Sequence, residues 1–459
     1  MNKKLFSLIL LGLVVVLVSC KQPENNKEKD NNEEEMTETS HYDWSRNANI
    51  YEVNIRQYTE EGTFNAFRTH LPRLKEMGVD ILWIMPIHPV GELNRKGTLG
   101  SYYAVRDYKA VNPEFGTMQD FKELVNEAHA LGMKVIIDWV ANHSSWDNVW
   151  LDENEDFYEK DEQGNFISPF DWTDVISFDY NNQEMRGAMT DALRFWITNA
   201  DIDGYRCDVA GMVPTDYWDN ARIELNKLKP VFMLAEDEDN ADLLRAAYDM
   251  NYGWKLHHHM NDIAKGEKQA KDLWAYFLWS GTTFPEDAYR MNFITNHDEN
   301  SWNGTIGERM GDAAQAMAVL AWTVPGMPLI YSGQEAGLDK RLEFFEKDTI
   351  NWDNVVYADF YKTLNSLKKS NPALLAGAEG GMMIQLSEGQ NDDVFAFSRE
   401  KGGNQVVVIL NLSKEVQSFT IDGTQVSGDF TNSFTGEKIN IKENLDLELA
   451  PWEYLVLVK

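Results

Sequence analysis

Four carboxylates stand where short apolar runs of the chain end: Asp138, Asp208, Glu236 and Asp298. A single carboxylate at such a position is usually a helix N-cap or a surface charge. Four of them at equivalent positions predict a site where the carboxylates converge. Converging carboxylates serve two kinds of chemistry: they bind a metal ion, or they cleave a glycosidic bond as nucleophile and proton donor. Sequence spacing alone does not separate the two.

Polar residues beside these carboxylates fit a buried cluster. In the run "GYRCDV", Arg206 and Asp208 are two residues apart, so they share one face of a strand. Asn142 and His143 follow the first of the carboxylates, and His297 precedes the last. A buried group of negative charges needs a cation beside it, and this explains an arginine at the end of a buried strand.

The elements that position these residues alternate between apolar, strand-like runs and amphipathic helical stretches. The predicted strands are 50–55, 81–87, 134–140, 204–209, 231–236, 248–254, 290–298 and 328–335. The predicted helices are 63–77, 117–131, 183–200, 214–228, 308–322 and 354–369. Eight such strands predict an α/β fold, a parallel (β/α)8 TIM barrel with its chemistry at the C-terminal ends of the strands. A doubly wound sheet is the alternative, but no glycine-rich phosphate loop follows the first strand.

Two segments interrupt this alternation. We expect the catalytic barrel to comprise residues 43–143 and 181–370, with 144–180 as a short loop insertion after the third strand. A loop of that length inside a compact domain is usually functional. From residue 371 to 459 the pattern changes to short alternating runs with turn signals, which predicts a C-terminal antiparallel β-sandwich domain.

The N-terminus has the pattern of an exported protein. Residues 1–19 combine a Lys-Lys start with an apolar run too short to span a membrane, and they end before Cys20. The run Leu-Val-Ser-Cys resembles the lipobox of bacterial lipoproteins, which implies lipidation of Cys20 and anchoring to the cell envelope. An ordinary secretory signal with a chance cysteine is the alternative. Residues 20–42 are polar and acidic and read as a disordered tether. This pattern is compatible with an anchor on either face of the membrane.

Composition limits the partners. The 459 residues carry a formal net charge of −32, and the field of such a protein repels polyanions. Nucleic acid is therefore excluded as a partner, and a neutral substrate fits better. The chain also has 15 Trp, 18 Tyr and 22 Phe, whose rings fill cores and also form platforms for sugar faces.

The motifs around the carboxylates resemble the four signatures of the α-amylase family of glycoside hydrolases, and the likeness extends over about residues 43–459. The first three are "DWVANH" (138–143), "GYRCDV" (204–209) and the "LAED" run that contains Glu236. The fourth is "ITNHD" (294–298). The runs "GVDILWIMPI" and "VPGMPLIYSGQE" resemble the flanking second-strand and eighth-strand patterns. The resemblance implies a β/α-barrel enzyme of the retaining kind.

Carried over position by position, the resemblance implies three catalytic residues. Asp208 is the expected nucleophile, Glu236 the general acid and base, and Asp298 the residue that binds sugar hydroxyls and stabilises the transition state. Arg206 is expected to keep Asp208 ionised. The remaining substrate-binding positions implied are Tyr103, which stacks on the sugar, and the hydrogen-bonding His143 and His297.

The chain departs from the family pattern at the positions that contact the leaving sugar. Ser101 stands where many members have histidine, and Val209 after the nucleophile resembles members that cleave α-1,6 bonds. Asn142 corresponds to a calcium ligand in many members, and its acidic loop is either a structural Ca2+ site or a solvated surface. The chemistry itself requires no cofactor.

The expected function is hydrolysis of α-1,4-glucosidic bonds of starch or maltooligosaccharides, by a monomer anchored to the membrane through its lipid. Two alternatives on the same scaffold are an α-1,6-glucosidic hydrolase and a transglycosylase, in which a sugar hydroxyl replaces water. A more distant one is a non-catalytic glucan-binding protein. Such a protein is expected to lose catalytic carboxylates, and this chain keeps all three.

Overall fold

The structure, a computed structural model, describes residues 43–459. The predicted signal peptide, Cys20 and the tether lie outside the described residues. Among the helices of the described part, none is long and apolar enough to cross a membrane.

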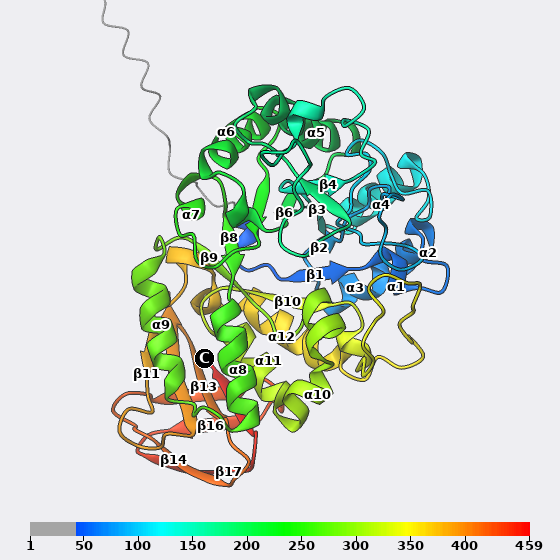
Figure 1. Cartoon of the computed structure of the whole chain (residues 1–459). Coiled ribbons are helices and arrows are strands. Elements are labelled where there is room, and N and C mark those ends of the chain that lie inside the picture. The colour runs from blue at the N-terminus through cyan, green and yellow to red at the C-terminus, as the bar shows by residue number, and fades with distance from the viewer. Residues whose placement is uncertain (1–42) are drawn as a thin grey trace, which may run out of the picture. The chain divides into compact units, whose positions relative to one another are not determined.

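Eight parallel strands close into a barrel, as the sequence predicted (Figure 1). Around the barrel they follow the order β1-β10-β9-β8-β7-β6-β3-β2. Their bounds are β1 Ile50–Val53, β2 Ile81–Ile84, β3 Lys134–Trp139, β6 Gly204–Cys207, β7 Phe232–Ala235, β8 Met250–Tyr252, β9 Tyr289–Asn292 and β10 Met327–Tyr331. Nearly every residue of these strands is buried, because the strands have the barrel core on one side and helices on the other.

Helices cover the outside of the barrel. They are α1 Ile55–Tyr58, α2 Phe64–Arg68, α3 Leu71–Met77, α4 Met118–Ala130, α5 Gln183–Ala200, α6 Thr215–Asn226, α7 Leu243–Ala246, α8 Trp254–Lys265, α9 Asp272–Thr283, α10 Ile306–Met310, α11 Ala314–Thr323 and α12 Ala358–Ser370. Helix α4 begins with a capping box, in which Thr117 and Asp120 each bond the other's backbone N–H. This local chemistry fixes where the helix starts.

Three expectations about individual elements were wrong. The helix predicted over 63–77 is two helices, α2 and α3, because Pro72 lacks an N–H and fits only in the first turn of a new helix. Helices α8 and α9 were not predicted. The strand predicted to end at Asp298 ends at Asn292, and Asp298 instead precedes a π-helical turn, Glu299–Asn303.

The insertion after the third strand contains a two-stranded antiparallel sheet, β4 (His143–Ser145) paired with β5 (Val175–Ser177). It packs closely on the loop that follows β2. A Cβ added to Gly91 of that loop would lie 2.2 Å from the Cβ of Ser145, so only glycine fits there. The two loops are therefore in close contact at Gly91.

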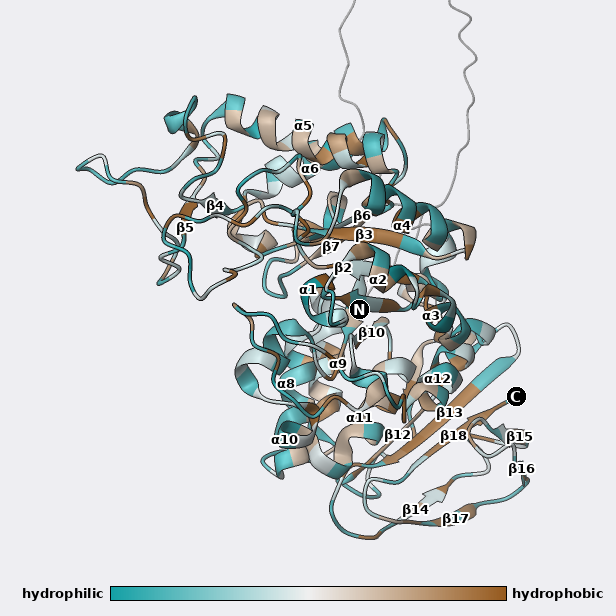
Figure 2. Cartoon of the chain, turned by 90° about the vertical axis from the view of Figure 1, so that its right-hand side faces the viewer, coloured by the Kyte–Doolittle hydropathy of each residue, from teal (hydrophilic) through white to brown (hydrophobic). Residues whose placement is uncertain are grey.

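The C-terminal strands form a sandwich, and the predicted fold class is confirmed. A six-stranded sheet has the order β11-β12-β13-β18-β15-β16, and β14 pairs with β17. The bounds are β11 Met383–Gln385, β12 Val394–Lys401, β13 Asn404–Asn411, β14 Gln417–Ile421, β15 Gly428–Asn432, β16 Lys438–Ile441, β17 Leu445–Leu449 and β18 Tyr454–Val458. Apolar side chains from both sheets form one core, and Figure 2 shows the hydrophobic β12 and β13 against the barrel helices.

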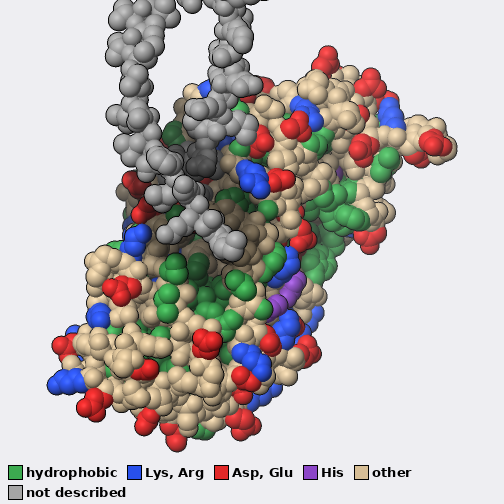
Figure 3. Space-filling model, turned by 90° about the vertical axis from the view of Figure 1, so that its left-hand side faces the viewer, with side chains coloured by type: hydrophobic (Ala, Val, Ile, Leu, Met, Phe, Trp, Pro, Cys, Tyr) green, Lys and Arg blue, Asp and Glu red, His purple; other side chains and the backbone are tan. Residues whose placement is uncertain are grey.

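The sandwich meets the barrel along α9 and α11. Trp274 of α9 packs on Phe395 of β12 with ring centroids 4.5 Å apart. Beside this contact, hydrophobic side chains gather on the face shown in Figure 3. They border a cavity of about 580 Å³ lined by residues that include Phe277, Phe284 and Met383.

Candidate functional site

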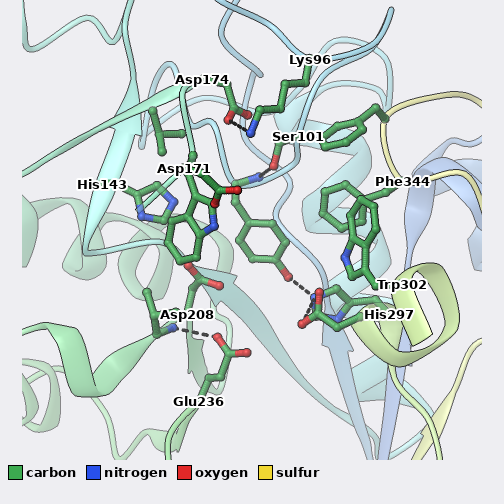
Figure 4. Close-up of a pocket in the computed structure, with 16 residues that line it drawn as sticks. Lys96, Ser101, His143, Asp171, Asp174, Asp208, Glu236, His297, Trp302 and Phe344 are labelled. Atoms are coloured by element: carbon green, nitrogen blue, oxygen red, sulfur yellow. Dashed lines mark hydrogen bonds and ion pairs between the residues drawn. The ribbon is translucent and has the colours of Figure 1, made fainter. Parts of the chain in front are cut away.

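A pocket of about 430 Å³ opens at the C-terminal ends of the barrel strands. Its volume lies within the roughly 300–1,000 Å³ of typical ligand sites. The predicted Tyr103, His143, Asp208, Glu236, His297 and Asp298 all line it, together with Lys96, Ser101, Asp171, Trp172, Asp174, Val175, Val209, Trp302, Phe344 and Phe345 (Figure 4). The structure thus brings together side chains from seven separate segments of the chain.

Strand alternation explains how three charged side chains come to face the barrel interior. On β3, Ile136 packs in the inner core while its neighbours Val135 and Ile137 pack in the outer layer. Asp138 continues the inner series. By the same period of two, Arg206 of β6 points inward between two outward residues, and Glu52 of β1 does the same. All three are fully buried.

Arg206 is the hub of the cluster. Its Nη1 donates to Asp138 Oδ1 at 2.9 Å and to Asp208 Oδ1 at 3.1 Å. Its Nη2 lies 2.9 Å from Glu236 Oε2, and its Nε donates to the hydroxyl of Tyr252 at 3.0 Å. Because one guanidinium touches three carboxylates, those carboxylates must lie close together.

Asp208 and Glu236 follow directly after paired residues of adjacent strands, Cys207 of β6 and Ala235 of β7. A second link joins the two segments, because the backbone N–H of Val209 donates to Glu236 Oε2 at 2.8 Å. Val209 reaches this position with a φ of 37°, a left-handed conformation that is strained for a β-branched residue. The strained turn therefore holds the two carboxylates together.

His297 is held between two carboxylates and a phenol. Its Nδ1 lies 2.5 Å from Glu52 Oε1, and its Nε2 lies 2.8 Å from the hydroxyl of Tyr103 and 3.4 Å from Asp298 Oδ2. Burial by itself would lower the pKa of His297, but Asp298 and Glu52 outweigh it and raise the pKa to about 9. The ring is therefore a cation at neutral pH.

The other two predicted substrate contacts have different surroundings. His143 is buried with no carboxylate partner among the described residues, and burial lowers its pKa to about 3, so it is neutral. Its ring lies edge-on to Trp172 at 5.4 Å. Tyr103 stacks against His297, and its hydroxyl donates to Asp138 at 3.1 Å.

One electrostatic expectation was wrong. From the sequence, Arg206 was expected to keep the pKa of Asp208 low. In the structure, burial and the neighbouring Glu236 raise the pKa of Asp208 well above its ordinary value, and Arg206 only opposes this shift. The reason is that Arg206 is shared. Five carboxylates lie around two cations, so neither cation can neutralise a single partner.

Several contact residues were missed in the sequence. Glu52 is the only charged residue in the first predicted strand's apolar core, and that anomaly was the available signal. Trp83 donates its indole N–H to Asp138 at 3.2 Å, and no polar signal marks it in an apolar strand. The rings of Trp302 and Phe344, with centroids 5.1 Å apart, form an aromatic wall of the pocket. Trp302 lies in the π-helical turn and Phe344 in a loop, and neither segment shows a periodic pattern in the sequence.

The predicted calcium ligand has no metal-binding partners. Within residues 43–459 there is no group of three or more His, Cys, Asp or Glu side chains placed to hold one ion. The amide nitrogen of Asn142 lies 3.2 Å from His143 Nδ1, and Asp147 of the same loop is bonded by the N–H of Glu92. No calcium site is therefore shown among the described residues.

Comparisons with known proteins agree with this geometry. The family model described as "Alpha amylase, catalytic domain" matches residues 25–177 and 158–372. An α-amylase of Haloarcula japonica is 28% identical over 84% of this chain. The chain covers only 59% of that protein, which is therefore considerably longer.

Two solved structures resemble nearly the whole described chain. A noncanonic maltogenic α-amylase from Thermotoga neapolitana has a TM-score of 0.82 and 29% identity, covering 90% of this chain and 99% of that one. An α-amylase from Lactobacillus plantarum has a TM-score of 0.81 and 30% identity, covering 91% and 99%. The chain belongs to the α-amylase family.

Proposed function

We propose that the protein is a retaining hydrolase that cleaves α-1,4-glucosidic bonds of starch or maltooligosaccharides by double displacement. One observation carries the proposal: Asp208 and Glu236 both contact the guanidinium of Arg206, in a pocket that Asp298 also lines. Retaining enzymes need a nucleophile and a proton donor roughly 5–5.5 Å apart, with no room for water between sugar and nucleophile. Adjacent strands supply that spacing.

In the proposed first step Asp208 acts in its ionised form, which the guanidinium of Arg206 favours against burial and Glu236. A carboxylate oxygen of Asp208 attacks the anomeric carbon, and the glycosidic C–O bond breaks. Glu236 gives its proton to the departing oxygen, so the leaving sugar is neutral. In the second step, ionised Glu236 takes a proton from water, and the oxygen of that water displaces Asp208. The proton returns to Glu236 and the enzyme is regenerated.

The remaining pocket residues have supporting roles in this proposal. Asp298 accepts hydrogen bonds from sugar hydroxyls and offsets the positive charge that develops in the transition state. His143, a neutral ring, and His297, a cation, hydrogen-bond the same sugar. His297 does so with its Nε2–H, which in this structure faces the hydroxyl of Tyr103. The ring of Tyr103 offers an apolar face for stacking.

The substrate class rests on the named relatives, which are α-amylases and a maltogenic α-amylase. A panel of amylose, pullulan, panose and isomaltose tests it. Faster release of products from amylose than from isomaltose supports α-1,4 cleavage, and the reverse order supports the α-1,6 alternative. Longer products from maltotriose would favour the transglycosylase. No product from any of the four would overturn the proposal.

We also propose that the protein is exported and anchored to the cell envelope through a lipid on Cys20, on the pattern of residues 1–20. The variant Cys20→Ala should then move from the membrane fraction to the soluble fraction. Continued membrane association would contradict the anchor.

We propose that the enzyme needs no cofactor, because the carboxylates of Asp208 and Glu236 supply both the nucleophile and the proton donor. We also propose that it is a monomer. Calcium binding by the loop at 144–180 stays a prediction from the sequence. Thermal melting with calcium and with a chelator tests it: a calcium-dependent rise in Tm would support the ion, and equal Tm values would exclude it.

A further inference from the structure

One end of the catalytic pocket is bordered by an ion pair between two loops. The ammonium of Lys96, in the loop after β2, lies 3.0 Å from Asp174 Oδ1 of the insertion. Both residues line the pocket. The side chain of Asp174 is 6% exposed and that of Lys96 is 35% exposed, so the carboxylate is buried while the ammonium is partly open to solvent.

The loops that carry this pair are fastened to each other beneath it. Val90 and Ala104 of the first loop pack with Val175 of the insertion in a small apolar cluster, against which Trp172 also lies. This cluster and the close approach at Gly91 fix the separation of the two loops. The ion pair therefore joins two loops that are also packed against each other.

A third loop braces the same end of the pocket. The backbone N–H of Thr98 donates to Glu346 Oε1 at 2.9 Å, and the N–H of Leu99 donates to the carbonyl of Phe345 at 3.1 Å. Phe345 itself lines the pocket. Lys96 is thus held from both sides, and three loops close this end together.

The direction of the substrate follows from the position of the proton donor. Glu236 must stand beside the glycosidic oxygen, so the leaving sugar extends past Glu236 and the retained sugar extends the other way. In Figure 4, Lys96 and Asp174 lie at the end of the pocket opposite Glu236, beyond Ser101. The ion pair therefore stands across the path of the non-reducing end of the chain.

We propose that the Lys96–Asp174 pair determines specificity by closing the non-reducing side of the pocket, so that the enzyme removes short products from chain ends. This inference rests on the proposed function and deepens it. The pair stops a long chain from passing through, and its polar atoms bond the hydroxyls of the terminal sugar. A substrate whose non-reducing end carries a bulky cap cannot enter far enough to bring its bonds to Asp208.

The test compares maltohexaose with maltohexaose capped by a benzylidene acetal on its terminal 4- and 6-hydroxyls. We expect the wild-type kcat/KM to be roughly 100-fold lower for the capped sugar than for the free sugar. In Lys96→Ala and in Asp174→Asn this ratio of free to capped kcat/KM should fall about tenfold. On starch, the variants should lower iodine staining faster per reducing end released, because they gain internal cleavage.

A matched control comes from the same loop. Lys109 pairs with Asp191 at 2.6 Å, is exposed, and does not line the pocket. Lys109→Ala should keep the wild-type ratio of kcat/KM for free and capped maltohexaose. The charge-reversed double variant Lys96→Asp, Asp174→Lys rebuilds the ion pair, so it should show the wild-type ratio of free to capped kcat/KM. This variant keeps the test available if a single variant fails to fold.

The outcomes separate this inference from the function on which it rests. If wild type cleaves the capped and free sugars at similar rates, or if the single variants keep the wild-type ratio, the role of the ion pair is wrong and the hydrolase remains. If neither sugar is cleaved, the proposed function falls and this inference falls with it.

Discussion

Two regions of this molecule bury charge in opposite ways. In the buried cluster at the catalytic pocket, the five carboxylates of Glu52, Asp138, Asp208, Glu236 and Asp298 surround the two cations Arg206 and His297, so negative charge is in excess there. At the junction of barrel and sandwich, Arg399 and Lys368 are both buried, and neither pairs with a carboxylate within residues 43–459.

The junction cations are satisfied by backbone carbonyls instead. Arg399 donates to the carbonyls of Gly381, Thr323 and Leu375 at 2.9–3.1 Å. Lys368 donates to two more carbonyls, at 2.8 and 2.9 Å. All five bonds tie separate segments together. The contrast teaches that a buried cation bonded to backbone carbonyls stabilises the fold, whereas a cluster with excess negative charge holds groups of shifted pKa that can transfer protons.

Removing a pocket carboxylate should have the largest effect. Asp208→Asn and Glu236→Gln should each lower kcat by ~10⁴-fold or more, because each removes a chemical step. Their Tm should stay level or rise, since a repelling charge is lost from the cluster. Kinetics and calorimetry check this. Near-full activity of either variant would overturn the assignment.

Removing a junction cation should do the reverse. Arg399→Met leaves three buried carbonyls without donors and should lower the free energy of unfolding by about 2–4 kcal/mol. Activity per folded molecule should remain close to wild type. Denaturant unfolding and active-site titration measure the two quantities. A large loss of kcat with unchanged stability would break the comparison.

Glu52→Gln should sharpen the electrostatic account of the pocket. It removes one of the two carboxylates that raise the pKa of His297 to about 9, so that pKa should fall. We expect a loss in kcat/KM of roughly tenfold, as for removal of one charged hydrogen bond. Titration of the His297 ring signal by NMR reads the pKa directly. An unchanged pKa would show that Asp298 alone sets it.

The smallest effect concerns pH and stability at the junction. Burial lowers the pKa of Lys368 from 10.5 to about 7. Between these values the unfolded state binds one more proton than the folded state, so this residue makes stability rise with pH. Lys368→Met should flatten that rise between pH 7 and 10. Equal slopes in variant and wild type would show that the folded Lys368 stays protonated.

The barrel could be predicted from the sequence because its strands are apolar runs bounded by turn signals. The charged side chains that face the barrel interior, such as Arg206, alternate with apolar residues that face outward. Glu52 was the exception, since one carboxylate in a short strand does not reveal which side faces inward. Helix α9, "DLWAYFLWSGTT", was missed because apolar residues occur on most of its sides, so its sequence lacks an amphipathic period, although only Leu273 and Tyr276 are buried.

Strand pairing by itself predicts only the residues of the site that adjoin a strand, whereas Tyr103, His297 and Asp298 were predicted through the family resemblance. Asp208 and Glu236 come directly after β6 and β7, so strand pairing places them together. Asp298 lies six residues beyond β9, and a π-helical turn rather than the strand positions it. The Lys96–Asp174 pair joins two loops far apart in sequence, and no local pattern announces such a contact.

The measurement that tests the central claim most directly is the anomeric form of the first product. Double displacement at Asp208 inverts the anomeric carbon twice, so an α-linked substrate should release an α-anomer. Proton NMR of the product of a few turnovers, recorded before mutarotation, distinguishes the two forms. The account predicts the α-anomer, and a β-anomer would contradict both the nucleophile and the mechanism.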